Sequence, residues 1–412
     1  MKLLQINTTL NTGSTGRIAE EIGLTVMQAG GQSVIAAGYT HRPSQSEVIR
    51  IGSAWDRRMH GLVTRLFDKH GFASAGATKR LIKAIELAQP DIIHMHNIHG
   101  YYLNVEVLFN YLKKAGKPVV WTLHDCWPFT GHCAHFERVN CYKWQTECNH
   151  CPNKRGYTES WLIDNSRKNF YHKKELFNGV ENLTIVTPSH WLANHVANSF
   201  LSAYPVKLIH NGVDLNMFKP HENTEFVRSK YGLSDKTIVL GVANTWKKKK
   251  ALQDFISLSY IINKDIQIVL IGMTPEQSKD LPKNIKAISR TENQQELAAL
   301  YSAAAVFINP TYVDNFPTTN IEALACGTPV ITYRTGGSIE AIDENTGLIV
   351  EKGDIAGLKA AIEQIVESGK EKYSKACIDR AVKLYNKNDR YKDYITLFDR
   401  ILNIQINKYS NL

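Results

Sequence analysis

The chain has 412 residues, 43% of them hydrophobic and 21% charged, which is ample material for packed cores and is not the composition of a disordered protein. Its longest apolar runs have the length of a strand, far short of the about 18 residues of a membrane span, so an integral membrane protein is excluded. The formal charge of +10 is uneven, with +8 in residues 1–210 and +2 in residues 211–412. A basic surface suits nucleic acid, an anionic membrane or a phosphorylated substrate, and charge alone does not choose among them.

Short apolar segments alternate with amphipathic ones along the chain, which is typical of parallel sheets with crossover helices. In the first half this pattern predicts strands at Lys2–Ile6, Ser33–Ala37, Asp91–Met95, Pro118–Leu123, Leu183–Thr187 and Val206–Ile209. In the second half it predicts strands at Thr237–Val242, Gln267–Ile271, Lys286–Ile288, Ala305–Ile308, Pro329–Thr332 and Gly347–Val350. Helices such as Gly16–Ala29 and Gln294–Ala303 fit between them, and the tail after about Asn388 reads as one or two more. The sequence therefore predicts two doubly wound α/β domains.

The segment Asn211–Ser234 is the expected linker, because it holds Gly212, Pro220 and a polar stretch at 221–224. The first residues read as a strand and not as a secretory signal, so we expect a cytoplasmic protein. Open parallel sheets bind ligands beyond the carboxyl ends of their strands, and two facing units would hold a ligand in the cleft between them. Functional motifs should therefore follow strands.

The first such motif, at residues 11–17, lies between the first strand and the first helix. Gly13 and Gly16 allow close backbone approach, and the helix N-terminus offers N–H groups to a phosphate or a sugar hydroxyl. The alternative is an ordinary tight turn, capped by Ser14 or Thr15.

Two further motifs lie in the second half. Four lysines at 247–250 follow the strand Thr237–Val242, where an ammonium could neutralise a leaving diphosphate, although a charge run is usually a solvated face. In the segment 314–331, the carboxylates Asp314 and Glu322 bracket a turn that leads into a helix. A carboxylate just inside a helix can accept hydrogen bonds from two ribose hydroxyls.

Together with residues 186–189 and 210–214, the segment 314–331 resembles the family 4 retaining glycosyltransferases of the GT-B fold, over essentially the whole chain. The stretches 96–102, 121–127 and 131–133 look like those of bacterial enzymes that build exopolysaccharide, colanic-acid-type and O-antigen units. The resemblance implies two Rossmann-like domains facing across a cleft. Residues 1–210 would bind the acceptor, with 388–412 packing back on them as a helix, and residues 211–387 would bind the donor.

The implied reaction moves a hexose from a nucleoside diphosphate sugar, with UDP or GDP, to a hydroxyl of a glycan carried on a polyprenyl diphosphate, with retention at the anomeric carbon. This reaction needs no cofactor for catalysis and no dedicated nucleophile. Its rate would depend on the positioning of the two substrates and on cations that stabilise the leaving diphosphate. The enzyme would work as a peripheral protein on the inner face of the cytoplasmic membrane, in the synthesis of surface polysaccharide such as exopolysaccharide or lipopolysaccharide.

The resemblance also assigns residues in the donor domain. Glu322 would hold the donor ribose, and Asp314, where glutamate is usual, would lie near the donor sugar. Lys250 would contact the diphosphate, with Lys249 or Lys247 supplying further charge, because Asn244 stands where the family usually has arginine. The remaining expected donor contacts are Asn315, Phe316, Pro317, Gly13 and Gly16. His124 matches a histidine close to the transferred sugar, and its alternative is a structural histidine bonded to Asp125.

Four cysteines, Cys133, Cys141, Cys148 and Cys151, fall within nineteen residues of a polar loop at 129–157 that has little periodicity. A Cys-x-x-Cys pair with two upstream cysteines is a plausible tetrahedral thiolate site for structural zinc, and a cytoplasmic location disfavours disulfides. Reduced structural thiols, or a disulfide or redox role, are the alternatives.

The basic first half has two further interpretations. Residues 55–70 read as a helix with Leu62, Leu66 and Phe67 on one face and Arg57, Arg58, Arg65 and Lys69 around it, which suits an anionic membrane surface or, alternatively, ordinary docking on the sheet. A zinc-containing nucleic-acid-binding protein is disfavoured, because no base-reading helix follows the cysteines. A nucleotide-sugar epimerase of GT-B architecture is the other enzyme alternative. A hydride-transferring oxidoreductase is weaker, since the dinucleotide fingerprint is absent.

Overall fold

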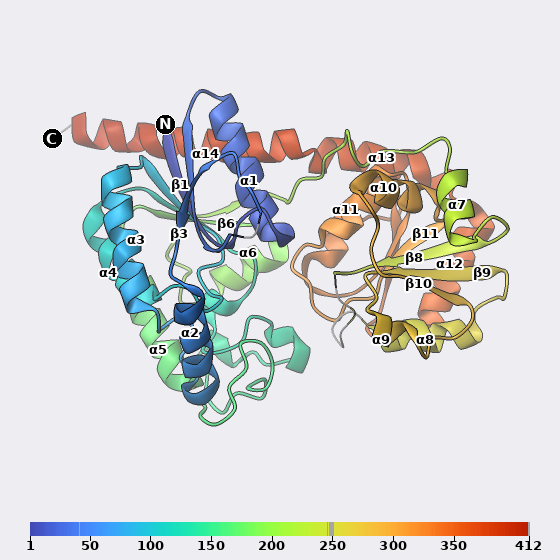
Figure 1. Cartoon of the computed structure of the whole chain (residues 1–412), viewed down its shortest axis with the longest axis horizontal. Coiled ribbons are helices and arrows are strands. Elements are labelled where there is room, and N and C mark those ends of the chain that lie inside the picture. The colour runs from blue at the N-terminus through green and yellow to red at the C-terminus, as the bar shows by residue number, and fades with distance from the viewer. Residues whose placement is uncertain (41, 245, 247–250, 411–412) are drawn as a thin grey trace. The chain divides into compact units, whose positions relative to one another are not determined.

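The computed structural model describes residues 1–40, 42–244, 246 and 251–410, with side chains as far as residue 404. The chain forms two compact units, one of residues 1–209 with the chain from Tyr391 onward, and one of His210–Arg390 (Figure 1). These junctions lie one and three residues from those that the sequence predicts.

The first unit is built on a seven-stranded parallel sheet in the order β3-β2-β1-β4-β5-β6-β7. Its strands are β1 (Lys2–Thr9), β2 (Gln32–Tyr39), β3 (Glu47–Arg50), β4 (Ile92–Met95), β5 (Val119–Thr122), β6 (Leu183–Thr187) and β7 (Val206–Leu208). The sequence missed β3, because this edge strand is mostly exposed and lacks an apolar run.

Helices cover both faces of this sheet (Figure 1). Leu3, Val120 and Val186 pack on one face against apolar residues of α1 and α14, and Ile93 and Trp121 pack on the other against residues of α3, α4 and α5. The helices are α1 (Gly13–Gln28), α2 (Ala54–Phe67), α3 (Ala75–Ala88), α4 (Val105–Ala115), α5 (Ser166–Phe177), α6 (His190–Ala197) and α14 (Lys387–Ser410), a single helix of which the part from Tyr391 belongs to this unit.

The loop after β5, which has little periodicity in sequence, buries several aromatic side chains. It forms three short 3-10 turns, η1 (Trp127–Phe129), η2 (Phe136–Val139) and η3 (Lys143–Gln145). The ring of Trp144 packs 4.9 Å from that of Phe129 and 5.1 Å from that of Phe136, and all three side chains are buried. Aromatic residues at irregular spacing escape a search for periodicity, and here they join the loop to the core of the first unit.

The second unit has a six-stranded parallel sheet in the order β10-β9-β8-β11-β12-β13. Its strands are β8 (Thr237–Val242), β9 (Ile266–Ile271), β10 (Ile285–Ile288), β11 (Val306–Asn309), β12 (Val330–Tyr333) and β13 (Gly347–Val350). Its helices are α7 (Glu225–Tyr231), α8 (Leu252–Ile261), α9 (Pro275–Ser278), α10 (Gln294–Ala303), α11 (Thr318–Ala325), η5 (Gly336–Ala341), α12 (Ile355–Ser368) and α13 (Glu371–Tyr385).

The linker predicted at Asn211–Ser234 is wrong as a description of this segment. Val213 pairs with Asn386 in an isolated bridge, α7 lies inside the segment, and Phe218 and Val227 are buried in the core of the second unit. Gly212 and Pro220 mark turns, but the apolar residues between and after them anchor the chain to the core.

Both sheets reverse their strand order at one place, between β1 and β4 in the first unit and between β8 and β11 in the second. In open α/β sheets such a switch point is where ligands bind, because the flanking loops diverge there. The segments 10–17 and 96–102 follow β1 and β4, and the segments 243–251 and 310–317 follow β8 and β11. Of the motifs that the sequence singled out, 11–17, 96–102 and the turn at 314–317 therefore lie at the switch points.

Among the helices of the described residues, none combines the length and the apolar character that a membrane span requires.

The buried histidines predict acid lability of the first unit. Burial lowers the pKa of His60 and His195 to about 4 and that of His94 to about 3. The unfolded chain protonates histidine near pH 6.5, so between pH 6.5 and 4 it binds more protons than the folded chain, and the free energy of unfolding falls as pH falls. His132, whose pKa is lowered by burial but raised overall by Asp68, opposes this effect.

We expect the free energy of unfolding of this unit to lose about 1.4 kcal/mol per pH unit for each net histidine. Denaturant titrations followed by tryptophan fluorescence between pH 7 and 4.5 measure this slope. The substitution His94→Gln should reduce it by about one proton, and a stability independent of pH over this range would contradict the prediction.

Candidate functional site

The turn after β1 brings the backbone close to the start of α1. Gly13 has a φ of +69°, and a Cβ on Gly16 would lie 2.8 Å from Thr9 Oγ1, so both positions require glycine. Thr12 is the N-cap residue of α1, but its side chain makes no capping hydrogen bond. Ser14 and Thr15 lie inside the helix, so the alternative in which one of them is the cap is wrong. The first turn of α1 also has no acidic side chain, which keeps its positive end suited to an anion.

A chain of buried hydrogen bonds connects β1, β4 and β5 at their carboxyl ends. Gln5 Nε2 donates to Ala19 O at 2.7 Å, and Gln5 Oε1 lies 3.0 Å from His96 Nε2. His96 Nδ1 lies 3.1 Å from His124 Nε2, with the two rings stacked 5.4 Å apart. The structure therefore joins His124, which the sequence singled out, to two polar residues that it did not.

These contacts fix which ring nitrogens carry protons. A carbonyl only accepts, so Gln5 turns its NH₂ group to Ala19 and its oxygen to His96. His96 must then donate from Nε2 and accept at Nδ1, because burial keeps its pKa far below the ordinary value. His124 must consequently donate from Nε2. Burial lowers the pKa of His124 to about 4, so at neutral pH it is uncharged and Nδ1 is its acceptor nitrogen.

Asp125 belongs to a different network, which the sequence analysis missed. Asp125 Oδ2 lies 2.8 Å from His99 Nε2, and Oδ1 accepts the N–H of Trp127 at 2.9 Å. His99 Nδ1 in turn lies 3.1 Å from the hydroxyl of Tyr157. Burial favours a raised pKa for Asp125, but His99 outweighs burial and lowers it to about 2. Both carboxylate oxygens thus have partners in this network, and the alternative of a structural His124 bonded to Asp125 stays a prediction.

In the second unit, the turn at 315–317 is the one that the sequence assigned to the transferred sugar. It is held by His210 and Asn211, with which this unit begins. Asn211 Nδ2 donates to Phe316 O at 3.1 Å, and the His210 ring stacks 4.9 Å from that of Phe316. Asn315, Phe316 and Pro317 are buried, whereas Asp314 is half-buried. The two motifs at 210–214 and 314–331 are thus parts of one structure.

A buried polar network fixes the start of α11. Asn320 Oδ1 accepts from Asn309 Nδ2 at 2.8 Å, and Asn320 Nδ2 donates to Ser338 O at 3.2 Å. These contacts tie the helix to β11 and η5. The N-cap residue is Pro317, and its side chain makes no capping hydrogen bond. The network places the first turn of α11 directly beyond the switch point.

Glu322 lies one turn further along α11. The hydroxyl of Tyr301, a buried residue of α10, donates to Glu322 Oε2 at 3.1 Å. Burial, and then the neighbouring charge of Glu322, hold the pKa of Tyr301 far above its ordinary value, so this phenol stays a donor. Glu322 itself is half-buried. A carboxylate has about four acceptor positions, of which Tyr301 uses one.

The loop after β8 is only partly described. Asn244 is exposed at the end of this strand, whereas Lys247, Lys249 and Lys250 lie outside the described residues. Ala251 is the N-cap residue of α8 and has a φ of +53°. This left-handed conformation is one that glycine adopts most readily.

A second carboxylate at this end of the sheet was not singled out by the sequence. Asp254 Oδ2 accepts from Tyr312 at 3.0 Å and from Tyr333 at 2.6 Å, so it ties α8 to the segment after β11 and to the last residue of β12. Burial, followed by the hydrogen bond to Asp254, raises the pKa of Tyr312 to about 12. An aspartate next to apolar helix residues looks like any surface carboxylate until its tyrosine partners are known.

All four cysteines of the loop after β5 line one small cavity of about 20 Å³. In the described part of the chain, no three or more His, Cys, Asp or Glu side chains are already disposed as a metal-ion site. Cys126, Cys326 and Cys377 are buried elsewhere. The zinc site predicted from the sequence stays a prediction.

Two family models match the chain, one on each half. The family described as Glycosyltransferase Family 4 matches residues 16–217, and the family described as Glycosyl transferases group 1 matches residues 223–384. The chain is 26% identical over 377 residues to the putative colanic acid biosynthesis glycosyl transferase WcaC of Escherichia coli K12, covering 87% of this chain and 89% of that protein. It is also 26% identical over 189 residues to N-acetyl-alpha-D-glucosaminyl L-malate synthase of Bacillus anthracis, covering 44% of this chain and 49% of that protein.

Solved structures give the same fold over the full length. Sucrose-phosphate synthase from Thermosynechococcus elongatus superimposes with a TM-score of 0.75 at 18% identity, covering 98% of this chain and 99% of that one. HepE of Anabaena, solved in complex with UDP-glucose, superimposes with a TM-score of 0.65 at 15% identity and covers 100% of both chains. With two Rossmann-like units of this fold and a family model on each half, the chain belongs to the family 4 glycosyltransferases of the GT-B fold.

Proposed function

We propose that this glycosyltransferase moves a hexose from a nucleoside diphosphate sugar to a hydroxyl of a lipid-linked glycan, with retention, in the synthesis of a bacterial surface polysaccharide. The observation that carries the donor half of this proposal is Glu322, which the Asn309–Asn320–Ser338 network and the Tyr301 hydroxyl hold beyond the β8–β11 switch point. Its carboxylate accepts the two ribose hydroxyls of the nucleotide, and the turn at 315–317 meets the sugar.

The chemical step then depends on charge placement in both units. An anomeric carbon that loses a phosphate develops positive charge, which a nearby cation would destabilise. A neutral His124, held by His96 and Gln5, can orient a sugar hydroxyl without that penalty. The departing diphosphate oxygen takes the proton of the acceptor hydroxyl, so the protein supplies no nucleophile. The roles given to Lys250 and Lys249 at the diphosphate, and to Asp314 at the sugar, stay predictions.

Two relatives bear on the substrates. HepE was solved with UDP-glucose, so a UDP-sugar is a candidate donor beside a GDP-sugar. The similarity to WcaC over 87% of this chain favours an acceptor of the colanic-acid type.

The surface of the first unit suits an enzyme that meets its acceptor at a membrane. On α2, Trp55 is 67% exposed and Leu62 and Phe67 are exposed as well, whereas the residues that bury this helix are His60, Gly61 and Thr64. The helix therefore turns its apolar side outward, against the alternative of docking that side on the sheet.

A neighbouring turn extends this apolar surface. Trp161 donates its backbone N–H to Arg65 O at 2.7 Å, and Asn165 Nδ2 donates to Phe67 O at 2.8 Å, so the turn is pinned to α2. Leu162 in this turn is 67% exposed. We call the exposed apolar side chains of α2 and this turn the apolar face; they are Trp55, Met59, Leu62, Phe67, Trp161, Leu162 and Ile163.

Basic residues border the apolar face. Arg58 of α2 and Lys69, just after this helix, are exposed. Arg57, expected to face a membrane, instead donates to Gly38 O at 2.9 Å and lies over the ring of Tyr39, so it serves the fold. An apolar surface with a basic border matches an anionic bilayer.

The donor site is tested by the substitution Glu322→Gln, which removes the negative charge and one acceptor. We expect a loss of activity of about 100-fold or more, because the ribose hydroxyls then meet an amide, while circular dichroism stays unchanged. A thermal-shift panel of UDP, GDP, ADP and their sugars identifies the donor in the unchanged protein and should show no shift in the variant. The exposed Glu344→Gln is the matched control, and full activity of Glu322→Gln would contradict the assignment.

The histidine relay is tested by Gln5→Glu. A carboxylate beside His96 favours its protonated form and so raises its pKa, which disturbs the proton arrangement of His124. The unchanged enzyme should show no inflection in kcat/KM from His124 between pH 5.5 and 8, because the pKa of that group is about 4. The variant should gain a pH-dependent inflection in this range, with a lower kcat and a similar KM for the donor. Identical pH profiles would show that the relay does not position His124.

Membrane docking is tested with vesicles that contain phosphatidylglycerol or only phosphatidylcholine. Replacing Leu62 and Leu162 together by Ser should weaken co-sedimentation with anionic vesicles about tenfold or more, because two exposed side chains no longer insert. Leu87→Ser, at a leucine of α3 that is 86% exposed, is the control and should change nothing. Binding of the unchanged protein should also weaken as the salt concentration rises. The variant Arg58→Ala should bind more weakly than the unchanged protein. Equal binding by the double variant and the control would contradict this role.

A further inference from the structure

The loop between β5 and α5 holds a group of soft ligands that the proposed transfer reaction does not use. Cys133, Cys141, Cys148 and Cys151 line one cavity of about 20 Å³, which Phe136 and Trp144 help to close. A volume of this size is comparable to that of a single small ion or water molecule.

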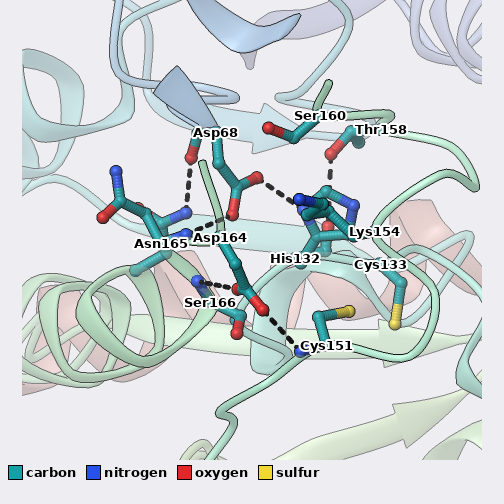
Figure 2. Close-up of polar contacts among 12 residues, drawn as sticks. Asp68, His132, Cys133, Cys151, Lys154, Thr158, Ser160, Asp164, Asn165 and Ser166 are labelled. Atoms are coloured by element: carbon teal, nitrogen blue, oxygen red, sulfur yellow. Dashed lines mark hydrogen bonds and ion pairs between the residues drawn. The ribbon is translucent and has the colours of Figure 1, made fainter. Parts of the chain in front are cut away.

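Two of the four sulfurs are already neighbours. The side chains of Cys133 and Cys151 lie next to each other in Figure 2, and both line this cavity. Cys148 Sγ accepts the backbone N–H of Gly131 at 3.2 Å, a type of contact that also stabilises a metal-bound thiolate. A Cβ on Gly131 would lie 2.7 Å from Cys148 Cβ and 2.1 Å from Ser166 O, so only glycine lets this turn approach so closely.

A buried cation lies in the same region. Lys173 of α5 is fully buried, and its Nζ donates to Trp127 O at 2.8 Å and to Thr130 O at 3.1 Å. Burial lowers the pKa of Lys173 to about 7, and Nζ also lies 3.4 Å from the centre of the Trp127 ring. A buried lysine is costly unless negative charge is near, and four thiolates around a divalent ion carry a net charge of −2.

We propose that these four cysteines bind one structural zinc ion as a tetrathiolate site. Zinc prefers four sulfur ligands in a tetrahedron with Zn–S distances of about 2.3 Å, so binding draws the thiols of Cys141 and Cys148 inward to the Cys133–Cys151 pair. Four protons leave the thiols as the ion binds, and no oxidation takes place.

The contacts around the cysteines indicate what the ion stabilises (Figure 2). Cys151 N donates to Asp164 Oδ2 at 2.6 Å, and Asp164 Oδ1 accepts from Ser166 N at 2.9 Å. On the other side, His132 Nδ1 lies 2.5 Å from Asp68 Oδ1, and Asp68 Oδ2 accepts from Asn165 N at 2.9 Å.

These hydrogen bonds connect the cysteines to the C-terminal end of α2. Asp68 is the C-cap residue of α2, and Thr158 Oγ1 donates to His132 O at 3.3 Å. Zinc at the cysteines would therefore hold the turn at 157–165 against α2. The loop itself has only short 3-10 turns as regular structure, and a metal ion is the kind of cross-link that stabilises such a loop.

The first experiment measures metal in the full chain, purified without chelators and with reduced thiols. Elemental analysis should give about one zinc per chain. After removal of zinc, titration with Co²⁺ should produce the sulfur-to-cobalt charge-transfer bands and tetrahedral d–d bands of a tetrathiolate site. This readout needs no variant, so a failure to fold does not obscure it.

The second experiment assigns the ligands. Replacing Cys133, Cys141, Cys148 or Cys151 singly by Ala should lower the zinc content at least several-fold, whereas the matched control Cys126→Ala, at a buried cysteine of the same loop outside the cavity, should retain it. Chelation should speed proteolytic cleavage within 129–165 and leave cleavage of the second unit unchanged.

Three results would overturn the proposal. These are a protein without metal whose thiols are all reduced, a mass two hydrogens lower that reports a Cys133–Cys151 disulfide, and equal zinc in the control and in the four variants.

Discussion

The whole protein depends on one constraint, that all the strands of both sheets run parallel. A parallel sheet is covered by helices on both faces, so its strand interiors are apolar and cannot carry chemistry. Polar side chains are displaced to the carboxyl ends, and the greatest divergence of loops is at the point where strand order reverses. The turn after β1, His96 after β4, Asn244 after β8 and the turn at 315–317 after β11 all follow from this single arrangement.

The polar groups at these ends do not stand alone but are fixed by buried partners from other elements. Gln5 is a residue inside a strand, yet its amide decides the protonation pattern of His96 and through it that of His124. Asn320 plays the corresponding part in the second unit, where it ties α11 to β11 and η5. In both cases a neutral amide with a donor and an acceptor side orients a functional group without adding charge to the interior.

In the first unit, the loop after β5 connects the strand ends to the proposed metal site and to the apolar face. The loop after β5 continues from His124 and Asp125 through the cysteines to the turn at 157–165, which is pinned to α2. Hydrogen bonds through His132 and Asp68 connect these parts. The proposed metal site and the apolar face therefore share one structural element. Loss of order at the metal site would also disorder the residues of the apolar face in the turn at 157–165.

The sequence alone determined the alternation of strands and helices, the two Rossmann-like units and the motifs at 11–17, 124, 210–214 and 314–331, because apolar periodicity and turn residues are local properties of the chain. It missed β3, whose exposed edge has no apolar run, and α7, whose short span was hidden in a polar segment. Only the tertiary structure decided the partners: His96 for His124, His99 for Asp125, Tyr301 for Glu322, and the tyrosines of Asp254. The partners in these pairs lie 21 to 79 positions apart in the chain, and His99 and Asp125, for example, follow different strands. No local pattern encodes which strand ends will meet. The physical reason is that a hydrogen bond depends on where two elements pack, and packing is settled by the whole core.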